Sequence, residues 1–174
     1  SCPGCDPWID TSGIEVNFDE FEVSIAIVYT EEAPKNVMSV PIMPDQLSPV
    51  ASPATIGKRR WKPRDLLASA LLHDERGIGW SEWFESAGID VRDVTAGFDF
   101  SDSDFATSAA EAGLGFALVS IPLVAELLAD GRLVQPFDHA LDPKRTWFAT
   151  TTQKELEGPF AAAAWRWFNE QGRT

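Results

Sequence analysis

The fold class is indicated by one continuous stretch, Phe98-Asp-Phe-Ser-Asp-Ser-Asp-Phe-Ala-Thr-Ser-Ala-Ala-Glu-Ala-Gly-Leu-Gly-Phe-Ala-Leu-Val119. Alternating apolar residues predict a strand over Asp93–Phe100, and the polar run Ser101–Ser103 supplies cap residues for a helix that ends at Gly113. The apolar run Gly115–Val119 predicts the next strand. Strand, helix and strand in this order make a βαβ unit, so the stretch predicts an α/β fold.

The same alternation continues on both sides of this stretch. Upstream, a predicted strand over Ala70–His73 precedes a predicted helix over Trp80–Ala87. Downstream, Pro122 opens a helix over Leu123–Leu128, and Leu133–Phe137 is predicted as a further strand. Repeated βαβ units predict a mainly parallel sheet with helices on both faces and right-handed crossovers.

The two ends of the chain follow a different pattern. Strands are predicted over Phe21–Tyr29 and Met38–Met43, and Leu47–Pro53 is expected to be extended because it holds two prolines. Trp147–Thr151 predicts a late strand that returns toward the first ones, and Glu157–Gln171 predicts an amphipathic helix. The apolar face of that helix is predicted to consist of Phe160, Ala164, Trp167 and Phe168. Two crossing segments indicate two lobes.

Composition excludes several classes of function. The chain has 174 residues, of which 44% are hydrophobic, enough for a packed core. Its 27 acidic against 14 basic residues give a net charge of -13, so we expect the chain alone not to bind nucleic acid. No apolar run reaches the roughly 20 residues of a membrane helix, and no secretory signal is visible. A cytoplasmic protein without membrane partners is expected.

Few residues suggest catalysis or metal binding. Cys2 and Cys5 form a CxxC pair at the terminus, which we interpret as part of a loose end segment rather than a redox or zinc motif. His73 ends a predicted strand and His139 lies in a predicted loop, so each is expected to be a surface or strand-end residue. We therefore expect no catalytic residue, no metal and no cofactor.

The start of the helix after Phe100 admits two interpretations. Unpaired N–H groups and hydroxyls at Ser101–Ser103 could hold a small anion, or these residues could form an ordinary helix cap. The residue types favour the cap. The carboxylates of Asp99, Asp102 and Asp104 lack the glycine and terminal glutamate of a calcium loop, and they are better explained as negative charge at a helix N-terminus.

Taken together, Phe100–Ser103, Ala109–Leu118 and Leu128–Phe137 resemble the effector-binding domain of LysR-type transcriptional regulators. The branch that holds the glycine-cleavage activator and the β-lactamase regulator is the most similar. Pro49-Val-Ala-Ser-Pro53 is similar to the Pro-Val-Cys-Ser-Pro crossing strand of that branch, and Ile25–Tyr29 resembles its Ala-Ile-Arg-Tyr-Gly strand. The resemblance extends from about Thr11 to Phe168.

This resemblance implies a two-lobed, periplasmic-binding-protein-like (type 2) α/β fold, with sheets flanked by helices and lobes joined by two crossing strands. Lobe I is expected over residues 1–48 and 151–174, and lobe II over residues 49–150. Lobe I is expected to be incomplete, because the family's first βα unit is not visible. The N-terminal helix-turn-helix with which the family binds DNA is not visible either.

The resemblance also implies a small effector bound between the lobes. Carried over to the matching positions, the ligand-binding residues are Thr11, Ser12, Tyr29, Thr30, Val50, Ser52 and Ser103. Purely structural alternatives remain open: Thr11 and Ser12 as turn residues, Tyr29 as a lobe-interface residue, and Ser52 as a residue that shapes the crossing. The sequence departs from the family's pattern where Ser24 replaces Asp, Val28 replaces Arg and Thr30 replaces Gly.

The implied function is regulation by ligand binding. A small molecule, anionic or amino-acid-like, would be coupled to the geometry of a homodimer or tetramer, with DNA bound only through the helix-turn-helix segment. Two alternatives belong to other classes. A solute-binding protein of a transport system would be secreted, and an enzyme on the same bilobal scaffold would need a general base or a metal set.

Overall fold

The computed structural model describes residues 8–9, 17–20, 22–74, 79–91, 94 and 97–171. Four residues of the sequence predictions, Cys2, Cys5, Thr11 and Ser12, lie outside the described residues. The chain divides into unit 1, Ser1–Pro44 with Lys144–Thr174, and unit 2, Asp45–Pro143. It therefore passes twice between the units, and both passages lie a few residues before the predicted lobe boundaries at 48/49 and 150/151.

Unit 2 is an α/β sandwich built on a four-stranded sheet of order β3-β6-β4-β5. Its strands are β3 (Leu47–Val50), β4 (Leu71–Asp74), β5 (Gly97–Phe100) and β6 (Phe116–Ser120). Its helices are α1 (Pro53–Ile56), η1 (Pro63–Ala68), α2 (Trp80–Ser86), α3 (Ser103–Glu111), η2 (Pro122–Val124) and α4 (Ala125–Ala129). Strand β4 is parallel to β5 and β6, whereas β3 is antiparallel to β6.

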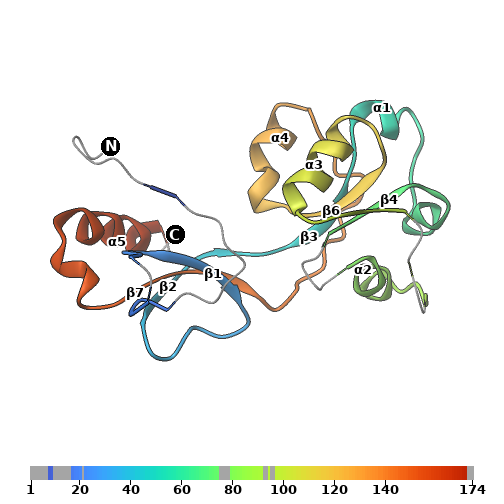
Figure 1. Ribbon diagram of the computed structural model, residues 1–174. Helices are drawn as coiled ribbons and strands as arrows, with labels where there is room; N and C mark the ends of the chain where they lie inside the picture. Colours follow the sequence, from blue (N-terminus) through green and yellow to red (C-terminus); the bar gives the residue numbers. More distant parts are fainter. Residues whose placement is uncertain are drawn as a thin grey trace. The chain divides into compact units, whose positions relative to one another are not determined.

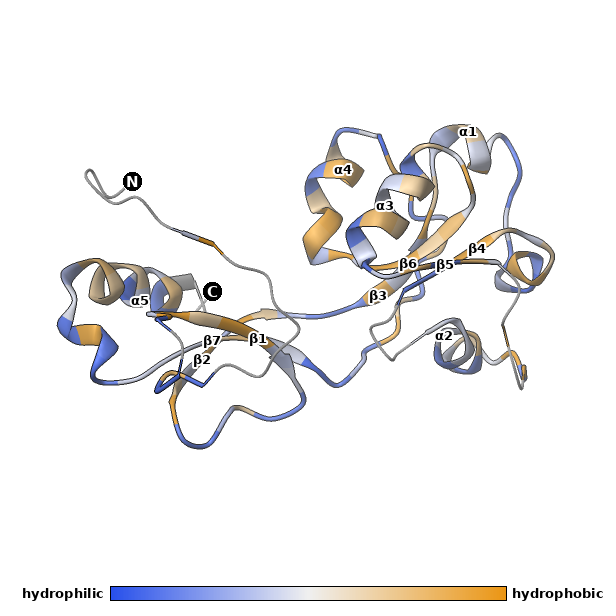
Figure 2. Cartoon of the chain, in the orientation of Figure 1, coloured by the Kyte–Doolittle hydropathy of each residue, from blue (hydrophilic) through white to orange (hydrophobic). Residues whose placement is uncertain are grey.

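Helices cover both faces of this sheet, as Figure 1 shows for α2 and α3. Because side chains alternate along a strand, Leu71 and Leu72 point to opposite faces. Leu71 belongs to a core cluster with Trp83 of α2, and Leu72 belongs to a second cluster with Ala110 of α3. Strand β6 is coloured largely hydrophobic in Figure 2, and every one of its residues is buried. A strand covered on both faces needs this continuous apolar sequence.

An ion pair joins the end of α3 to the segment after α4. The guanidinium of Arg132 donates to both carboxylate oxygens of Glu111, with Nε to Oε1 at 2.6 Å and the second bond at 2.9 Å. This hydrogen bonding, together with the negative charge of Glu111, raises the pKa of Arg132. The pair lies at the surface of unit 2.

Unit 1 is a three-stranded sheet of order β1-β7-β2, with β1 (Ala26–Thr30), β2 (Met38–Pro44) and β7 (Thr146–Thr151). Helices η3 (Glu155–Glu157) and α5 (Pro159–Gln171) follow β7. Strand β7 lies between β1 and β2 and is antiparallel to both. The two sheets with flanking helices confirm the predicted α/β fold class.

Some local predictions are wrong. A mainly parallel sheet describes only part of unit 2, because β3 runs antiparallel and both pairings of unit 1 are antiparallel. Residues 133–137 form no strand; Val134 makes only an isolated bridge to Ala51. Pro53 does not keep its segment extended, because it occupies the first turn of α1, where a missing N–H costs nothing.

The predicted apolar face of α5 is also wrong. Ala161 and Trp165 are the buried residues, whereas Phe160 and Trp167 are 48% and 54% exposed. Ala164 is exposed and Phe168 is half-buried. Because four alanines precede Trp165, the apolar pattern does not specify which side faces the sheet, and the packing of the large indole decides it. Among the described residues, no helix combines the length and the apolarity required to cross a bilayer.

Candidate functional site

A hollow of about 350 Å³ lies in unit 1, lined by Tyr29, Thr30, Glu31, Glu32 and Arg145. We call it the β1–β7 hollow. Two of the ligand-binding residues expected from the sequence, Tyr29 and Thr30, lie side by side on its wall. A volume at the lower end of the range for ligand pockets suits a small molecule.

Strand pairing creates this hollow from residues far apart in the sequence. The antiparallel register sets Tyr29 opposite Trp147 and Thr30 opposite Thr146. The carboxyl end of β1 therefore meets the amino end of β7, where Arg145 immediately precedes the strand. The rings of Tyr29 and Trp147 lie 4.8 Å apart between centroids, with an angle of 31° between their planes. This aromatic contact holds the ring of Tyr29, which lines the hollow, against Trp147.

Arg145 is the cation of the hollow. Its Cζ lies 5.7 Å from the centroid of the Tyr29 ring, within the range of a cation–π interaction. Its Nε lies 3.7 Å from Oε1 of Glu31, which is an ion pair but too long for a hydrogen bond. This Nε is buried and has no hydrogen-bond partner among the described residues. A guanidinium that lines a hollow is suited to donate hydrogen bonds to the oxygens of a carboxylate ligand.

The two carboxylates of the hollow are not equivalent. Glu32 pairs with Lys35 at 3.7 Å, three residues further along the chain. Glu31 has Arg145 as its ion-pair partner and remains 69% exposed at its side chain. The hollow therefore presents one positive and one negative group close together, with the remaining charges neutralising each other.

Ser103 lies in unit 2 at the first residue of α3. The helix cap is the neighbouring Asp102, whose carboxylate accepts from the backbone N–H of Asp104 at 2.6 Å. The carbonyl of Ser103 accepts from the hydroxyl of Thr107 at 2.7 Å. The structure thus assigns the cap to an aspartate. Two carboxylates at this helix end oppose a free anion there, and Ser103 keeps its half-buried hydroxyl as a polar group.

Val50 and Ser52 lie elsewhere in unit 2. Val50 is completely buried in β3 and packs in the core cluster that contains Ala110. Ser52 caps α1, where its Oγ accepts from the N–H of Thr55 at 3.2 Å. Its own N–H donates to the carbonyl of Ala110 near the end of α3. Ser103 begins that helix, so roughly 10 Å of helix separates the two serines, and the structure does not bring them together.

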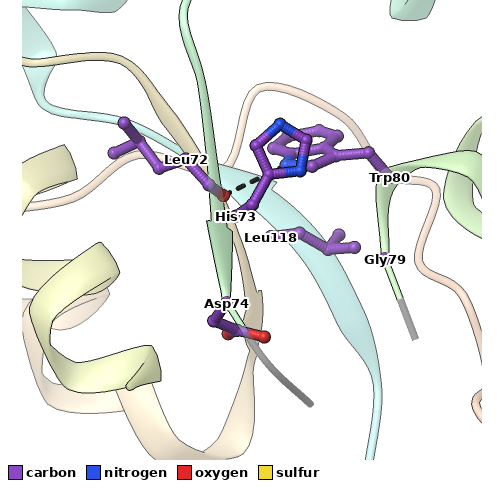
Figure 3. Close-up of a pocket in the computed structure, with 6 residues that line it drawn as sticks. All are labelled: Leu72, His73, Asp74, Gly79, Trp80 and Leu118. Carbon is purple, nitrogen blue, oxygen red and sulfur yellow. Dashed lines mark hydrogen bonds between the residues drawn. The ribbon is translucent and has the colours of Figure 1, made fainter. Parts of the chain in front are cut away.

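A second, much smaller space lies beside β4 and is lined by His73, Asp74, Trp80 and Leu118 among others (Figure 3). Its volume of about 20 Å³ admits no more than a water molecule. The indole N–H of Trp80 donates to the carbonyl of Leu72 at 3.1 Å, which closes one side. This space is too small for an effector.

His139 lies against α2 of unit 2. Nε2 of His139 lies 2.8 Å from the hydroxyl of Ser86, and its ring centroid lies 5.7 Å from that of Trp83. Within the described ranges, no group of three or more His, Cys, Asp or Glu side chains is placed to hold a metal ion.

Two α/β units, connected by two passages of the chain and carrying a polar hollow, define a ligand-binding protein. The model of the family described as the LysR substrate binding domain matches residues 10–173. The chain belongs to this family, as the resemblance in its sequence predicted. The match includes Thr11 and Ser12, whose positions are outside the described residues.

Characterised relatives are transcription regulators. The chain is 32% identical over 135 residues to the HTH-type transcriptional regulator PerR of Escherichia coli, covering 77% of this chain and 45% of PerR. It is 29% identical over 133 residues to the HTH-type transcriptional activator AmpR of Rhodobacter capsulatus, covering 76% and 45%. The glycine cleavage system transcriptional activator of Escherichia coli is 29% identical over 148 residues, covering 84% and 48%. The chain spans less than half the length of these relatives.

Solved structures agree with this fold. The effector domain of AmpR from Pseudomonas aeruginosa superposes with a TM-score of 0.77 at 24% identity, covering 91% of this chain and 76% of that one. The AmpR effector-binding domain from Citrobacter freundii gives a TM-score of 0.77 at 25% identity, covering 92% and 80%.

Sequence reasoning missed Arg145, Glu31 and Trp147. Glu31 and Glu32 directly follow Thr30 and could have been included as neighbours in the chain. Arg145 could not, because its place in the hollow depends on the register between β7 and β1. The signal that was available is its position just before a predicted strand.

Proposed function

We propose that this chain is the effector-binding, regulatory domain of a LysR-type transcription regulator. Its work is to bind a small molecule and to transmit the bound state to a larger protein, without making or breaking a covalent bond. The observation that carries this proposal is the match of the LysR substrate binding domain over residues 10–173.

The β1–β7 hollow supplies the effector contacts from unit 1. Tyr29 and Thr30 face it, and Arg145 adds a charge. Ser103, which lies in unit 2, stays a candidate because its position matches a ligand-binding position of the family. We retain Thr11 and Ser12 as candidates on the family resemblance. The buried position of Val50 and the capping hydrogen bond of Ser52 support structural roles for these two residues. A small polar effector, anionic or amino-acid-like, suits these groups.

The partners follow from the same proposal. The relatives are named as HTH-type regulators, so we assign DNA recognition to a helix-turn-helix segment and not to this acidic domain. The full regulator is proposed to act in the cytoplasm as a homodimer or tetramer. Transport and catalysis are less well supported, because the relatives are named as transcription regulators.

A thermal-shift screen tests the proposal. A ligand at 100 times its dissociation constant stabilises the folded state by about 2.7 kcal/mol, which corresponds to roughly 5 °C or more for a chain of this size. We expect a hit among small carboxylates, amino acids and cell-wall fragments. Thr30→Val and Ser103→Ala should weaken binding of that hit, whereas Ser108→Ala, an exposed hydroxyl further along α3, should not. A screen without hits on cooperatively folded protein would argue against a working sensor domain.

A further inference from the structure

We infer that the β1–β7 hollow binds the α-amino-carboxylate group of an amino acid, with Arg145 contacting the carboxylate and Glu31 contacting the ammonium. This inference rests on the proposed function and narrows it, because it decides between a simple anion and a zwitterion. All the residues that line this hollow belong to unit 1.

The first step is the unused donor on Arg145. A buried N–H without a partner costs free energy, and native proteins leave few of them. Nε of Arg145 is buried without a hydrogen bond, and the nearest carboxylate oxygen of its ion-pair partner is 3.7 Å away. The guanidinium offers a planar set of donors that matches the two oxygens of a carboxylate. Because Arg145 lines the hollow, its guanidinium is placed to bind a ligand carboxylate there.

The second step is the charge beside Arg145. A ligand that carries only a negative charge would meet Glu31 at close range, and a simple amine would meet Arg145. Both lose binding energy to the like charge. A zwitterion places each of its charges next to the opposite one. Glu32 also lines the hollow, and it pairs with Lys35 at 3.7 Å while both side chains remain largely exposed.

The third step is the backbone that presents Arg145. Lys144, directly before it, has φ of 57°, in the left-handed region that residues other than glycine rarely adopt. It is the only non-glycine residue with positive φ among those described. Such conformations cost free energy and are concentrated at functional sites, where the surrounding structure enforces them. Here the costly turn directs the chain into β7 with Arg145 at the rim of the hollow.

The size of the hollow limits the ligand. A space of about 350 Å³ suits one amino acid, and the paired rings of Tyr29 and Trp147 provide an aromatic surface beside it. In a peptide the two charged termini are separated by the chain, so only a free amino acid, or a residue that keeps both charges on one carbon, matches adjacent opposite charges.

The test measures affinities of the complete chain by titration calorimetry for the 20 free amino acids. For the tightest binder, its decarboxylated amine, its deaminated acid and a dipeptide that contains it are titrated in parallel. We expect the amino acid to bind at least about tenfold more tightly than each of the three analogues. Two further outcomes identify other sources: equal binding of the deaminated acid indicates a simple anion site, and equal binding of the dipeptide indicates a peptide site. Either result overturns the inference.

Two variants locate the site. Arg145→Gln should remove the preference for the amino acid over the amine, and Glu31→Gln should remove the preference over the deaminated acid. This exchange of selectivity is not expected from a folding defect. The controls Arg166→Gln and Glu157→Gln change exposed charges elsewhere in unit 1 and should leave both preferences intact. Unchanged selectivity in the hollow variants overturns the inference. If no amino acid binds but the broader screen finds another effector, the inference fails and the proposed function stands; if both are flat, both fail.

Discussion

The two units bury very different amounts of apolar side chain. The largest fully buried side chains of unit 2 include Trp83, Phe84 and Phe116, and both core clusters consist of its residues. In unit 1 the corresponding described residues are Thr150 and Thr151. Among the described residues, unit 2 thus has a two-sided apolar core, and unit 1 combines its three-stranded sheet with α5, of which Ala161 and Trp165 are buried.

The difference in burial indicates which unit is the more rigid one and which is the more adaptable one. Burial of apolar area is the main favourable contribution to stability, so unit 2 is expected to be the more stable scaffold. Unit 1 leaves Ile27, Met38, Phe160 and Trp167 substantially exposed. Ligand-binding segments are commonly found in the less stable parts of proteins, and the β1–β7 hollow lies in unit 1. Single substitutions in the two units test this difference in stability.

Truncating a tryptophan should cost far more stability in unit 2 than in unit 1. Trp83 is fully buried against Phe84 and Phe137, so Trp83→Ala should lower the free energy of unfolding by about 3–5 kcal/mol. Trp167 is 54% exposed on α5, and Trp167→Ala should cost less than about 1 kcal/mol. Urea unfolding followed by circular dichroism measures both. Equal losses would remove the contrast between the units.

Close backbone packing gives the second test. A Cβ on Gly115 would lie 2.3 Å from the carbonyl oxygen of Ala70, so the backbone must move in Gly115→Ala. We expect a loss of about 1–3 kcal/mol. A Cβ on Gly158 in unit 1 would meet no atom closer than 3.4 Å, and Gly158→Ala should change stability by only a few tenths. Thermal unfolding of the pair compares them, and a tolerant Gly115 would contradict the tight core of unit 2.

The start of α3 separates a structural residue from a candidate binding residue. Asp102 caps the helix, so Asp102→Ala should lower the free energy of unfolding by about 1 kcal/mol. The described contacts of Ser103 run through its backbone carbonyl, and Ser103→Ala should cost only a few tenths. Chemical denaturation of both variants is the measurement. A larger loss in the serine variant would make Ser103 a structural residue.

Backbone strain should be relieved in unit 1. All described positive-φ positions of unit 2 are glycines, namely Gly57, Gly88, Gly97, Gly113 and Gly131. In unit 1 the described residue with positive φ is Lys144. Lys144→Gly should therefore raise the free energy of unfolding by about 0.5 kcal/mol, which is what remains after the greater entropy of glycine in the unfolded chain is subtracted. Lys144→Ala keeps the strain and controls for the lost side chain. Differential scanning calorimetry compares them; a glycine variant no more stable than the alanine variant would contradict the expectation.

The predictability of the site varied with the range of the interactions involved. Tyr29 and Thr30 could be named because they end a strand that local alternation predicts and the family resemblance marks. Val50 and Ser52 were named from the same resemblance, yet the backbone hydrogen bond of Ser52 and the burial of Val50 both involve Ala110 of α3, more than 50 residues later in the chain. Pattern alone does not show which end of a sheet a residue occupies.

Most of the local elements, the α/β class and the family could be predicted from the sequence. Alternation, helix caps and proline positions depend on interactions within a few residues, and such local interactions can be predicted from the sequence. The insertion of β7 between β1 and β2 is visible only in the tertiary structure. This insertion brings Arg145 beside Thr30. The side of α5 that is buried, with Trp165, is likewise visible only there. The hydroxyl of Thr150 bonds to the carbonyl of Ala26 across 124 positions of sequence. Contacts of that range depend on the packing of the complete unit, and therefore no local pattern specifies them.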